Sequence, residues 1–389
     1  MIDRDLAPRL AAAARSFPAL TLTGPRQSGK STLCRQLFPR HPYVNLESPD
    51  VRRFALEDPR AFLAQCPAGA ILDEIQRAPE LTSYLQPIID ADPAPGRWIL
   101  TGSQHFALLE SVSQSLAGRS AVFNLLPLCR QEVCRFDEPP ATLDEALLHG
   151  GYPRIFDRQI DPADWLAAYV ATYVERDVRQ IANVGDLVSF QRFVALCAGR
   201  TAQLLNYSSL AADAGISQPT AKAWLSILEA SFIAFRLPAW SGNLRKRLVK
   251  MPKLHFYDSG LACWLLGIRD AAQLRSHPLR GAIFESWAVA EIAKHRANAG
   301  ENAGLYFYRD RNGVEADLLV EGAGGLVVVE VKAGETVTTD LLSPARRIAG
   351  VLGARVTGLP RIVYGGDARQ DRGDCRLLPW NAIPPADWA

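Results

Sequence analysis

The sequence feature that most restricts the fold is the segment Gly24–Ser31, which reads GPRQSGKS. It matches the pattern GxxxxGK followed by Ser or Thr, which predicts a phosphate-binding loop where a strand precedes it and a helix follows. Both neighbours are indicated here. The run Ala19–Thr23 is short, apolar and β-branched, and residues 31–38 place Leu33 and Leu37 at helical spacing. The segment therefore predicts the first βα unit of a parallel sheet.

The chemistry of such a loop explains its residue types. Glycines at both ends let the backbone curl so that successive N–H groups point at phosphate oxygens, and the following helix adds the positive end of its dipole. Lys30 is expected to neutralise the β- and γ-phosphates of ATP, and the Ser31 hydroxyl to bind Mg²⁺. The predicted ATP-binding residues are Gly24, Pro25, Arg26, Gln27, Ser28, Gly29, Lys30, Ser31 and Thr32. The alternative, a glycine-rich turn with a surface lysine, does not account for the flanking strand and helix.

An apolar run that ends in two acids supplies the second half of the predicted site. Residues 70–74 read AILDE. In open parallel sheets, ligands bind at the carboxyl ends of the strands, where Asp73 and Glu74 would lie. Asp73 is expected to reach the magnesium ion directly or through water, and Glu74 to act as the general base that polarises the attacking water. Without the loop, solvated acids at a strand end would be the simpler interpretation.

Two further positions complete the predicted catalytic set of Glu74, Ser103 and Arg119. Ser103 follows an apolar strand, where a small polar side chain can hold the attacking water or sense the γ-phosphate. Arg119 follows a helical run at residues 108–116 and precedes a fifth strand. From there it could reach the γ-phosphate of a neighbouring subunit, a contact that can accelerate hydrolysis about 10³–10⁵-fold. The alternative for Arg119 is a surface arginine or a partner of a helix carboxyl end.

Short apolar runs alternate with helical stretches in the first third of the chain. The five predicted strands are Ala19–Thr23, Tyr43–Leu46, Ala70–Asp73, Trp98–Thr101 and Ala121–Leu126. Strands that alternate with helices form a parallel sheet covered on both faces. We therefore predict an α/β fold whose first domain, residues 1–135, is a five-stranded P-loop ATPase module.

Length and charge limit what the remaining two thirds of the chain can be. At 389 residues the chain is long enough for two or three domains of roughly 150 residues each. A net charge of +2 gives no basic coat, so any nucleic-acid site must be a local patch. The seven cysteines are scattered without a CxxC pair, which is typical of free thiols in a reducing cytoplasm. The start carries two acids and no apolar run is long enough to span a bilayer, so we expect a cytoplasmic protein that binds no membrane.

Residues 136–280 are predicted to form a helical linker followed by a winged helix–turn–helix. The linker helices are expected to extend to about residue 181. In the helix–turn–helix, Ser209 is expected to cap the first helix, Gly215 to end it, and Ser217 to cap the second.

A local basic cluster follows the helix–turn–helix. It comprises Arg245, Lys246, Arg247, Lys250 and Lys253. These side chains, together with Lys222 on the exposed face of the second helix, could bind the phosphates of DNA or RNA. Trp224 is expected on or near the same face. Because the second helix carries only one basic residue, we favour the alternative, in which the winged helix packs against protein.

The last segment, residues 281–389, combines an amphipathic helix with several strands. Glu330 and Lys332 are two apart in one strand and would project from one face. Asp317 lies on the preceding strand, and an acid that faces E-x-K on the next strand resembles the core of PD-(D/E)xK nucleases. The resemblance implies that Asp317 and Glu330 hold magnesium and that Lys332 orients a water, while Glu285 joins from the helix. The alternative is a surface Glu–Lys pair on a scaffold without nuclease activity.

The stretches described so far together resemble an ATPase module of the AAA+ superfamily. More narrowly, the chain is similar to a prokaryotic family of ATP-binding proteins in which such a module precedes a C-terminal domain of unknown function. The resemblance rests on GPRQSGKST, AILDEIQRAPEL, ILTGSQ, SLAGRS, GGYPRIF, YVERDVRQI, GVEADLLV and VVVEVKAG, which lie between residues 24 and 334. It implies an AAA+-like strand order and assembly into a homo-oligomer.

The predicted function is ATP hydrolysis with Mg²⁺, coupled to a C-terminal half that binds a nucleic acid or a partner. Two alternatives stay open: a nucleotide-switched binding module with an inactive nuclease-like scaffold, and an ATP-gated, metal-dependent nuclease. A GTPase is disfavoured because no guanine-reading NKxD motif follows the third or fourth predicted strand. A small-molecule kinase shares the loop, but Asp73 and Glu74 suit the activation of water better than the binding of an acceptor.

Overall fold

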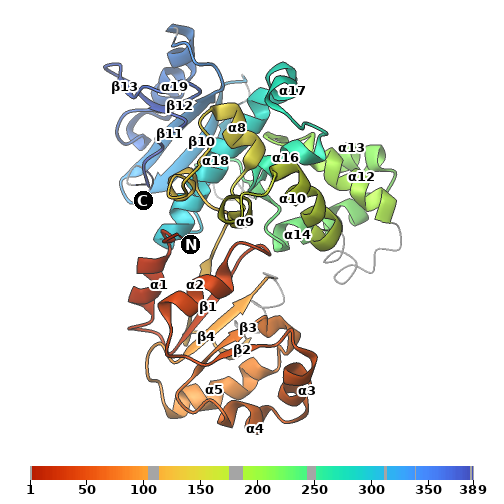
Figure 1. Ribbon diagram of the computed structural model, residues 1–389. Helices are drawn as coiled ribbons and strands as arrows, with labels where there is room; N and C mark the ends of the chain where they lie inside the picture. The colour runs from red at the N-terminus through yellow and green to blue at the C-terminus, as the bar shows by residue number, and fades with distance from the viewer. Residues whose placement is uncertain are drawn as a thin grey trace. The chain divides into compact units, whose positions relative to one another are not determined.

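The computed structural model describes residues 2–103, 114–174, 187–242, 251–310, 313–337, 339–385 and 388. Within it the chain separates into two compact units (Figure 1). The first consists of residues 1–127 with the short segments 230–232 and 297–300, and the second of the other residues. None of the described helices is both long and apolar enough to cross a bilayer.

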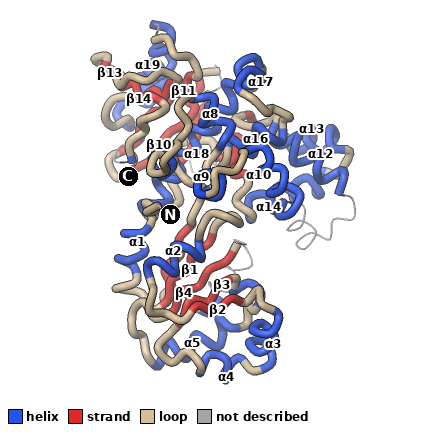
Figure 2. The backbone as a smooth tube through the Cα atoms, in the orientation of Figure 1, coloured by secondary structure: helices blue, strands red, loops and turns tan. Residues whose placement is uncertain are grey.

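The first unit is built on a parallel sheet (Figure 2). Its strands are β1 (Ala19–Thr23), β2 (Tyr43–Asn45), β3 (Ala70–Asp73), β4 (Trp98–Gly102) and β5 (Ser120–Asn124). They lie in the order β2-β3-β4-β1-β5, and every neighbouring pair is parallel. The predicted five-stranded parallel sheet is therefore confirmed, and the carboxyl ends of its strands share one edge.

Helices cover both faces of this sheet because its inner strands bury side chains on both sides. They are α1 (Ala7–Ala13), α2 (Lys30–Leu37), α3 (Pro49–Glu57), α4 (Pro59–Ala64) and α5 (Leu81–Ala91), with a 3₁₀ turn, η1 (Ile75–Arg77). On one face, Ile71 of β3 packs with Leu10 of α1 and Leu33 of α2. On the other face, the next residue, Leu72, packs with Leu85 of α5. The two layers hold β3 in place and so fix where its carboxyl end lies.

The second unit begins with helices and a small sheet. The helices are α7 (Arg130–Val133), α8 (Leu143–His149), α9 (Pro153–Asp157), α10 (Pro162–Tyr169), α12 (Leu187–Ala198), α13 (Tyr207–Ala214), α14 (Gln218–Ala230), α16 (Ser259–Leu265) and α17 (Ala271–Ser276), with a π-helical turn, η2 (Val170–Val174). The sheet consists of β6 (Gln203–Leu204), β7 (Ala234–Leu237) and β8 (Lys253–Phe256) in the order β6-β8-β7. The central strand, β8, pairs antiparallel with both neighbours and is buried throughout.

The helices α13 and α14 occupy the residues for which the sequence predicts a helix–turn–helix. Gly215 ends α13 in the left-handed region, with a φ of 72°, and Ser217 caps α14 through a backbone hydrogen bond in its first turn. The prediction that Ser209 caps α13 is wrong. Asn206 does so, because its side-chain oxygen accepts hydrogen bonds from the N–H of Ser209 and from the N–H before it.

Two side chains of this region lie deeper than predicted. Trp224 is buried, with its ring edge-on to Phe190 and Phe193 of α12, and so does not lie on an exposed face. Lys253, predicted in a basic surface cluster, is only 4% exposed within β8. In both cases a neighbouring element covers the side chain, which the local sequence pattern does not reveal.

Several predicted features fall outside the described residues. They are most of the helical run at 108–116, the linker helix from residue 175 to about 181 with all but the first two residues of the stretch YVERDVRQI, and the basic residues Arg245, Lys246, Arg247 and Lys250.

The rest of the second unit is a six-stranded mixed sheet in the order β13-β14-β12-β11-β10-β9. Its strands are β9 (Leu305–Arg309), β10 (Glu315–Gly322), β11 (Gly325–Lys332), β12 (Arg361–Tyr364), β13 (Gln370–Asp371) and β14 (Arg376–Pro379), and its helices are α18 (Arg280–Ala299) and α19 (Thr339–Leu352), followed by a 3₁₀ turn, η3 (Gly353–Arg355). Strands β9, β10 and β11 are antiparallel, whereas β12 joins β11 in parallel.

Helices α18 and α19 pack on opposite faces of this sheet. Val331 of β11 packs with Phe284 of α18, whereas Val328 packs with Ile348 of α19. Because α18 is held against β11 in this way, the residue after Phe284, Glu285, is brought close to the strands that carry the predicted acids.

Candidate functional site

The phosphate loop leaves β1 through a glycine that no other residue could replace without a clash. Gly24 has a φ of 149°, and a Cβ atom there would lie 2.2 Å from the carbonyl oxygen of Leu125. Gln27 and Gly29 also have left-handed backbone conformations, with φ of 63° and 93°. The predicted residues Gly24, Pro25, Arg26, Gln27, Ser28, Gly29, Lys30, Ser31 and Thr32 thus form one curled segment that runs from the end of β1 into α2.

Lys30 is the central charge of this segment. It is 5% exposed, and its Nζ donates hydrogen bonds to the carbonyl oxygens of Gly24 (3.0 Å) and Pro25 (2.8 Å). Burial lowers the pKa of Lys30 below its ordinary value, against the opposing effect of Glu74 and Asp73. A phosphate oxygen would give this ammonium a charge-assisted hydrogen bond, which is stronger than a bond to a neutral carbonyl.

Ser31 and Asp73, the two predicted magnesium ligands, lie together. The Ser31 hydroxyl donates to Asp73 Oδ2 over 2.8 Å, and Asp73 is 4% exposed. The same carboxylate accepts hydrogen bonds from Tyr43 and Thr101, which the sequence reasoning missed. Both belong to strands that flank β3, so only the strand order reveals them. A hydroxyl beside a carboxylate is a ligand set that suits magnesium bound to phosphates.

Glu74 and Ser103 also lie together, with Gln76 between them. Ser103 Oγ donates to Glu74 Oε2 over 3.2 Å, and the Gln76 amide donates to both side chains. Glu74 has a left-handed φ of 57°, which costs a residue other than glycine roughly 1–2 kcal/mol. Such strain at a strand end is a feature of functional sites. Gln76 is a further candidate that the sequence reasoning missed.

Arg4 is another contributor that the sequence reasoning missed. It is 7% exposed, and its guanidinium donates to the carbonyl oxygens of Ser28 (2.7 Å) and Leu126 (2.9 Å). The segment before α1 is thereby tied to the phosphate loop and to the chain that follows β5.

Arg119 is not brought close to the phosphate loop of its own chain. It immediately precedes β5, which pairs in parallel with β1 so that Ser120 lies opposite Ala19, at the amino end of the sheet. The loop begins at the other end of β1. The Arg119 side chain is 30% exposed, and its Nε and Nη2 donate to the two carboxylate oxygens of Asp90 over 2.6 and 2.9 Å.

The four predicted nuclease-like residues of the second unit do converge. Lys332 Nζ lies 3.1 Å from Glu330 Oε2 and 3.8 Å from Asp317 Oδ2. Lys253, which the sequence reasoning placed elsewhere, lies 2.8 Å from Glu285 and 3.8 Å from Asp317. Since Glu330 is 2% exposed, the interpretation as a surface Glu–Lys pair does not describe it.

Glu285, Asp317 and Glu330 form an acidic cluster with Lys253 and Lys332, and its acids outnumber its lysines. Burial, followed by the charge of Asp317, raises the pKa of Glu285 and of Glu330 to about 8. Burial opposes the charged form of Lys253 and Lys332, yet the acids raise the pKa of both lysines above the ordinary value. Glu330 Oε1 is buried and has no hydrogen-bond partner among the described residues.

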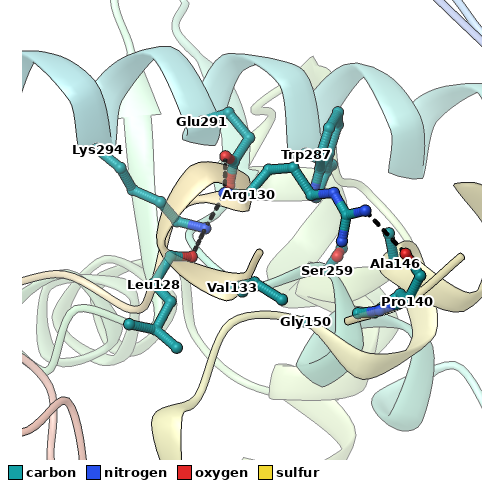
Figure 3. A pocket seen from close by; sticks show the side chains of 10 residues that line it. All are labelled: Leu128, Arg130, Val133, Pro140, Ala146, Gly150, Ser259, Trp287, Glu291 and Lys294. Carbon is teal, nitrogen blue, oxygen red and sulfur yellow. Dashed lines mark hydrogen bonds and ion pairs between the residues drawn. The ribbon is translucent and has the colours of Figure 1, made fainter. Parts of the chain in front are cut away.

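A separate polar pocket in the second unit is too small for a substrate (Figure 3). Its volume is about 10 Å³, roughly the room for one water molecule. Beside it, Glu291 accepts hydrogen bonds from Lys294 Nζ (2.8 Å) and from the backbone N–H of Arg130 (2.6 Å), and the Arg130 side chain donates to the carbonyl oxygen of Pro140 (2.8 Å). Nε and Nη1 of Arg130 are buried without a hydrogen-bond partner among the described residues, and the guanidinium lies 4.9 Å from the ring centre of Trp380. We interpret this network as structural, because the pocket beside it has room for only about one water molecule.

Family models match three successive parts of the chain. An AAA domain matches residues 16–134, which include the phosphate loop, Asp73, Glu74, Ser103 and Arg119. A domain of unknown function (DUF8612) matches residues 140–272, and a second domain of unknown function (DUF4143) matches residues 280–383 and so includes the acidic cluster.

Two solved structures are similar to this chain only weakly, in both sequence and shape. The Walker-type ATPase paby2304 of Pyrococcus abyssi is 14% identical, with a TM-score of 0.47, over 68% of this chain and 96% of that one. A RuvB protein of Thermotoga maritima is 16% identical, with a TM-score of 0.31, over 61% of this chain and 90% of that one. We infer nothing from similarities of this extent.

Two mycobacterial proteins are similar over most of the chain. The uncharacterized proteins Rv2008c of Mycobacterium tuberculosis and Mb2031c of Mycobacterium bovis are each 32% identical over 336 residues, 86% of this chain and 74% of theirs. Identity of this level over this length shows that the chain belongs to the same family as these two proteins.

Proposed function

We propose that the chain hydrolyses ATP, with the phosphate loop and the end of β3 as the active site. The observation that carries the proposal is the convergence of Lys30, Ser31 and Asp73. Ser31 and Asp73 are 42 residues apart in the chain, yet their side chains are hydrogen-bonded. The match of residues 16–134 to an AAA domain supports the same conclusion.

Each residue of the site then has a distinct role. Lys30 neutralises charge on the β- and γ-phosphates, and Ser31 and Asp73 would hold Mg²⁺. When bound, the ion would offset the negative charge that develops on the phosphate oxygens. Glu74 accepts the proton of the attacking water, and Ser103 helps to keep the Glu74 carboxylate in place through the 3.2 Å hydrogen bond. A base held in this way favours attack by water over transfer of the phosphate to a small-molecule acceptor.

The magnesium assignment predicts a non-additive double variant. Ser31→Ala and Asp73→Asn should each reduce ATP affinity in Mg²⁺ to the affinity measured in EDTA, because each removes a ligand of the same ion. The double variant should lose no more than the weaker-binding single variant. Isothermal titration calorimetry measures these affinities, with Ser16→Ala as a control that removes an exposed hydroxyl of the same unit. Losses that simply add would mean that Ser31 and Asp73 act separately.

We further propose that Arg119 acts on ATP bound to a neighbouring subunit of a homo-oligomer. Its position at the amino end of the sheet favours this, since the phosphate loop of its own chain begins at the opposite end of β1. Its partial exposure is also compatible with an interface. Asp90 would keep the guanidinium oriented until a γ-phosphate replaces it as partner.

The proposed role of Arg119 can be tested by mixing inactive variants. Arg119→Ala should lower kcat by about 10³-fold or more, because an arginine that stabilises the transition-state charge contributes that much. Mixing Arg119→Ala with Lys30→Ala should partly restore phosphate release, since one interface then carries an intact loop and an intact arginine. Arg15→Ala, which removes an exposed arginine of the same unit and keeps Arg119, should stay active. No restoration in mixtures, with a rate per chain that is constant on dilution to the monomer, would rule out action between subunits.

For the second unit we propose a metal-dependent nuclease site at Asp317, Glu330 and Lys332, with DNA or RNA as the substrate. The buried Glu330 Oε1, which lacks a hydrogen-bond partner among the described residues, supports it because such an oxygen can bind a cation. Asp317 and Glu330 would hold the metal ion, which would supply Lewis-acid chemistry when bound. Lys332 would orient the attacking water. The alternative is a scaffold that only binds a partner and responds to nucleotide.

Removing the Glu330 carboxylate distinguishes a metal-dependent nuclease from a scaffold that only binds a partner. Glu330→Gln should abolish Mn²⁺ binding by this site and any cleavage, while ATP turnover without nucleic acid stays normal. Glu335→Gln, which neutralises an exposed acid nearby, is the matched control and should change neither. Calorimetric titration with Mn²⁺ and cleavage assays on single- and double-stranded DNA and RNA measure the two effects. If the unaltered chain neither binds millimolar Mn²⁺ at this site nor cleaves any substrate, the partner-binding scaffold is the better account.

For the helix–turn–helix we propose packing against protein rather than recognition of DNA. Trp224, near the middle of α14, is buried against α12, so this face of the helix packs in the protein core. Lys222 is exposed, but its Nζ lies 5.6 Å from the ring centre of Tyr207. Binding of this region to duplex DNA with a steep salt dependence would contradict the proposal.

A further inference from the structure

Lys253 is a buried cation whose ion-pair partners are three carboxylates. Its Nζ lies 2.8 Å from Glu285 Oε1, 2.7 Å from Glu315 Oε1 and 3.8 Å from Asp317 Oδ1. Lysine is almost never fully buried unless it is paired, and Lys253 is 4% exposed. The central strand of the β6-β8-β7 sheet thus supplies an ammonium group to acids that belong to α18 and β10.

Asp317 lies between two lysines and so divides the cluster into two cation positions. Its Oδ1 is 3.8 Å from Lys253 Nζ, and its Oδ2 is 3.8 Å from Lys332 Nζ. The first position lies among Glu285, Glu315 and Asp317 and holds the Lys253 ammonium. The second lies between Asp317 and Glu330, where the Lys332 side chain is 38% exposed and the buried Glu330 Oε1 has no hydrogen-bond partner among the described residues.

The acids of the cluster outnumber its cations. Its four carboxylates are those of Glu285, Glu315, Asp317 and Glu330, and its two ammonium groups are those of Lys253 and Lys332. A third cation, the guanidinium of the half-exposed Arg309, lies 3.9 Å from Glu315 Oε2. When all are ionised, one negative charge remains. Without Lys253 the excess would be two, and Glu285 would lose the ion pair that it makes at 2.8 Å.

We propose that Lys253 takes the place of a second divalent cation, so that this site binds one metal ion where its carboxylates alone would accept two. The inference rests on the metal site proposed above at Asp317 and Glu330. An ammonium group neutralises charge and donates hydrogen bonds as a bound metal with its waters would. It cannot act as a Lewis acid, so chemistry at this site would depend on the single ion beside Glu330.

The test is to count the ions bound by a variant that lacks this charge. Lys253→Met keeps an unbranched apolar side chain and should bind one Mn²⁺ more per chain than its parent. Free Mn²⁺ is measured by electron paramagnetic resonance during titration of the full chain without nucleotide. All proteins carry Asp73→Asn, which removes the proposed metal ligand of the first unit. Lys253→Arg keeps the positive charge and should bind the same number of ions as the parent.

Each outcome separates this inference from the proposed metal site. An additional ion in Lys253→Met and none in Lys253→Arg supports the inference. Equal numbers in Lys253→Met and the parent overturn it, and one ion in both leaves the metal site at Asp317 and Glu330 standing. If the parent binds no metal ion and the Lys253→Met variant binds one, Lys253 does occupy a cation position. That result would also mean that the natural chain has no metal site at Asp317 and Glu330. No ion in either protein overturns both.

A second variant keeps the test decisive if loss of the ammonium unfolds the chain. Lys253→Gln removes the charge but leaves an amide that can donate hydrogen bonds to the carboxylates around it. It too should gain one Mn²⁺ relative to the parent, once circular dichroism shows that it is folded. An unchanged ion count in this folded variant overturns the inference as well.

Discussion

Replacing Lys30 by alanine is expected to lower the affinity of the chain for ATP and magnesium by about 100-fold or more. The reason is that the Lys30 ammonium is the main counter-charge for the phosphates, and hydrogen bonds to charged groups contribute roughly 1.5–3 kcal/mol each. Two such bonds would be worth at least about 3 kcal/mol, and 1.4 kcal/mol corresponds to about tenfold in affinity. The two backbone carbonyls that accept from Lys30 cannot replace this charge, since they are themselves acceptors.

Isothermal titration calorimetry with ATP and Mg²⁺ measures the loss in the Lys30→Ala variant. Lys222→Ala is the matched control, because it removes an exposed lysine and should bind ATP normally. Thermal unfolding without nucleotide should be recorded for both, since Lys30 is buried and its removal can alter stability. An affinity of the Lys30 variant within about threefold of the natural chain would mean that this segment does not bind phosphates.

Replacing Glu74 by glutamine is expected to keep ATP binding and to lower kcat by about 10²–10⁴-fold, the usual contribution of a general base. Glutamine retains the shape of the side chain and an oxygen that can accept the hydrogen bond from Ser103. It has no carboxylate to take a proton from water. We therefore expect kcat to fall while the affinity for ATP stays unchanged.

Phosphate release at saturating ATP measures this loss, and calorimetry on the same preparation measures binding. Glu80→Gln is the control, because it neutralises an exposed acid a few residues further along the chain and should leave both quantities unchanged. Normal turnover by Glu74→Gln would show that another group accepts the proton. Loss of binding and turnover together would instead indicate a positioning role for Glu74.

The parts of the fold that the sequence predicts well are those governed by neighbouring residues. The strand before Gly24, the helix that begins at Lys30 and the acids that end β3 all follow from patterns a few residues long. The carboxyl ends of parallel strands meet at one edge, so a parallel sheet in which β1 and β3 lie close together places Ser31 beside Asp73.

The parts that the sequence did not predict depend on which strands become neighbours. Tyr43 and Thr101 bind Asp73 because β2 and β4 flank β3, and no local pattern indicates that order. Lys253 stands close to other basic residues in the sequence, which is typical of a surface cluster. Its burial follows from the central position of β8 and from the acids on α18 and β10 that neutralise it. A buried lysine can be recognised only once its partners are known.

Release of inorganic phosphate from ATP by the full chain in Mg²⁺ tests the central claim most directly. The natural chain, Lys30→Ala and Glu74→Gln should be purified in parallel, so that a contaminating ATPase would appear equally in all three. We expect saturable release by the natural chain that stops in EDTA, with both variants at the level of the EDTA control. Equal release by all three proteins, or no release by the natural chain at any protein concentration, would contradict an ATPase site at Lys30, Asp73 and Glu74.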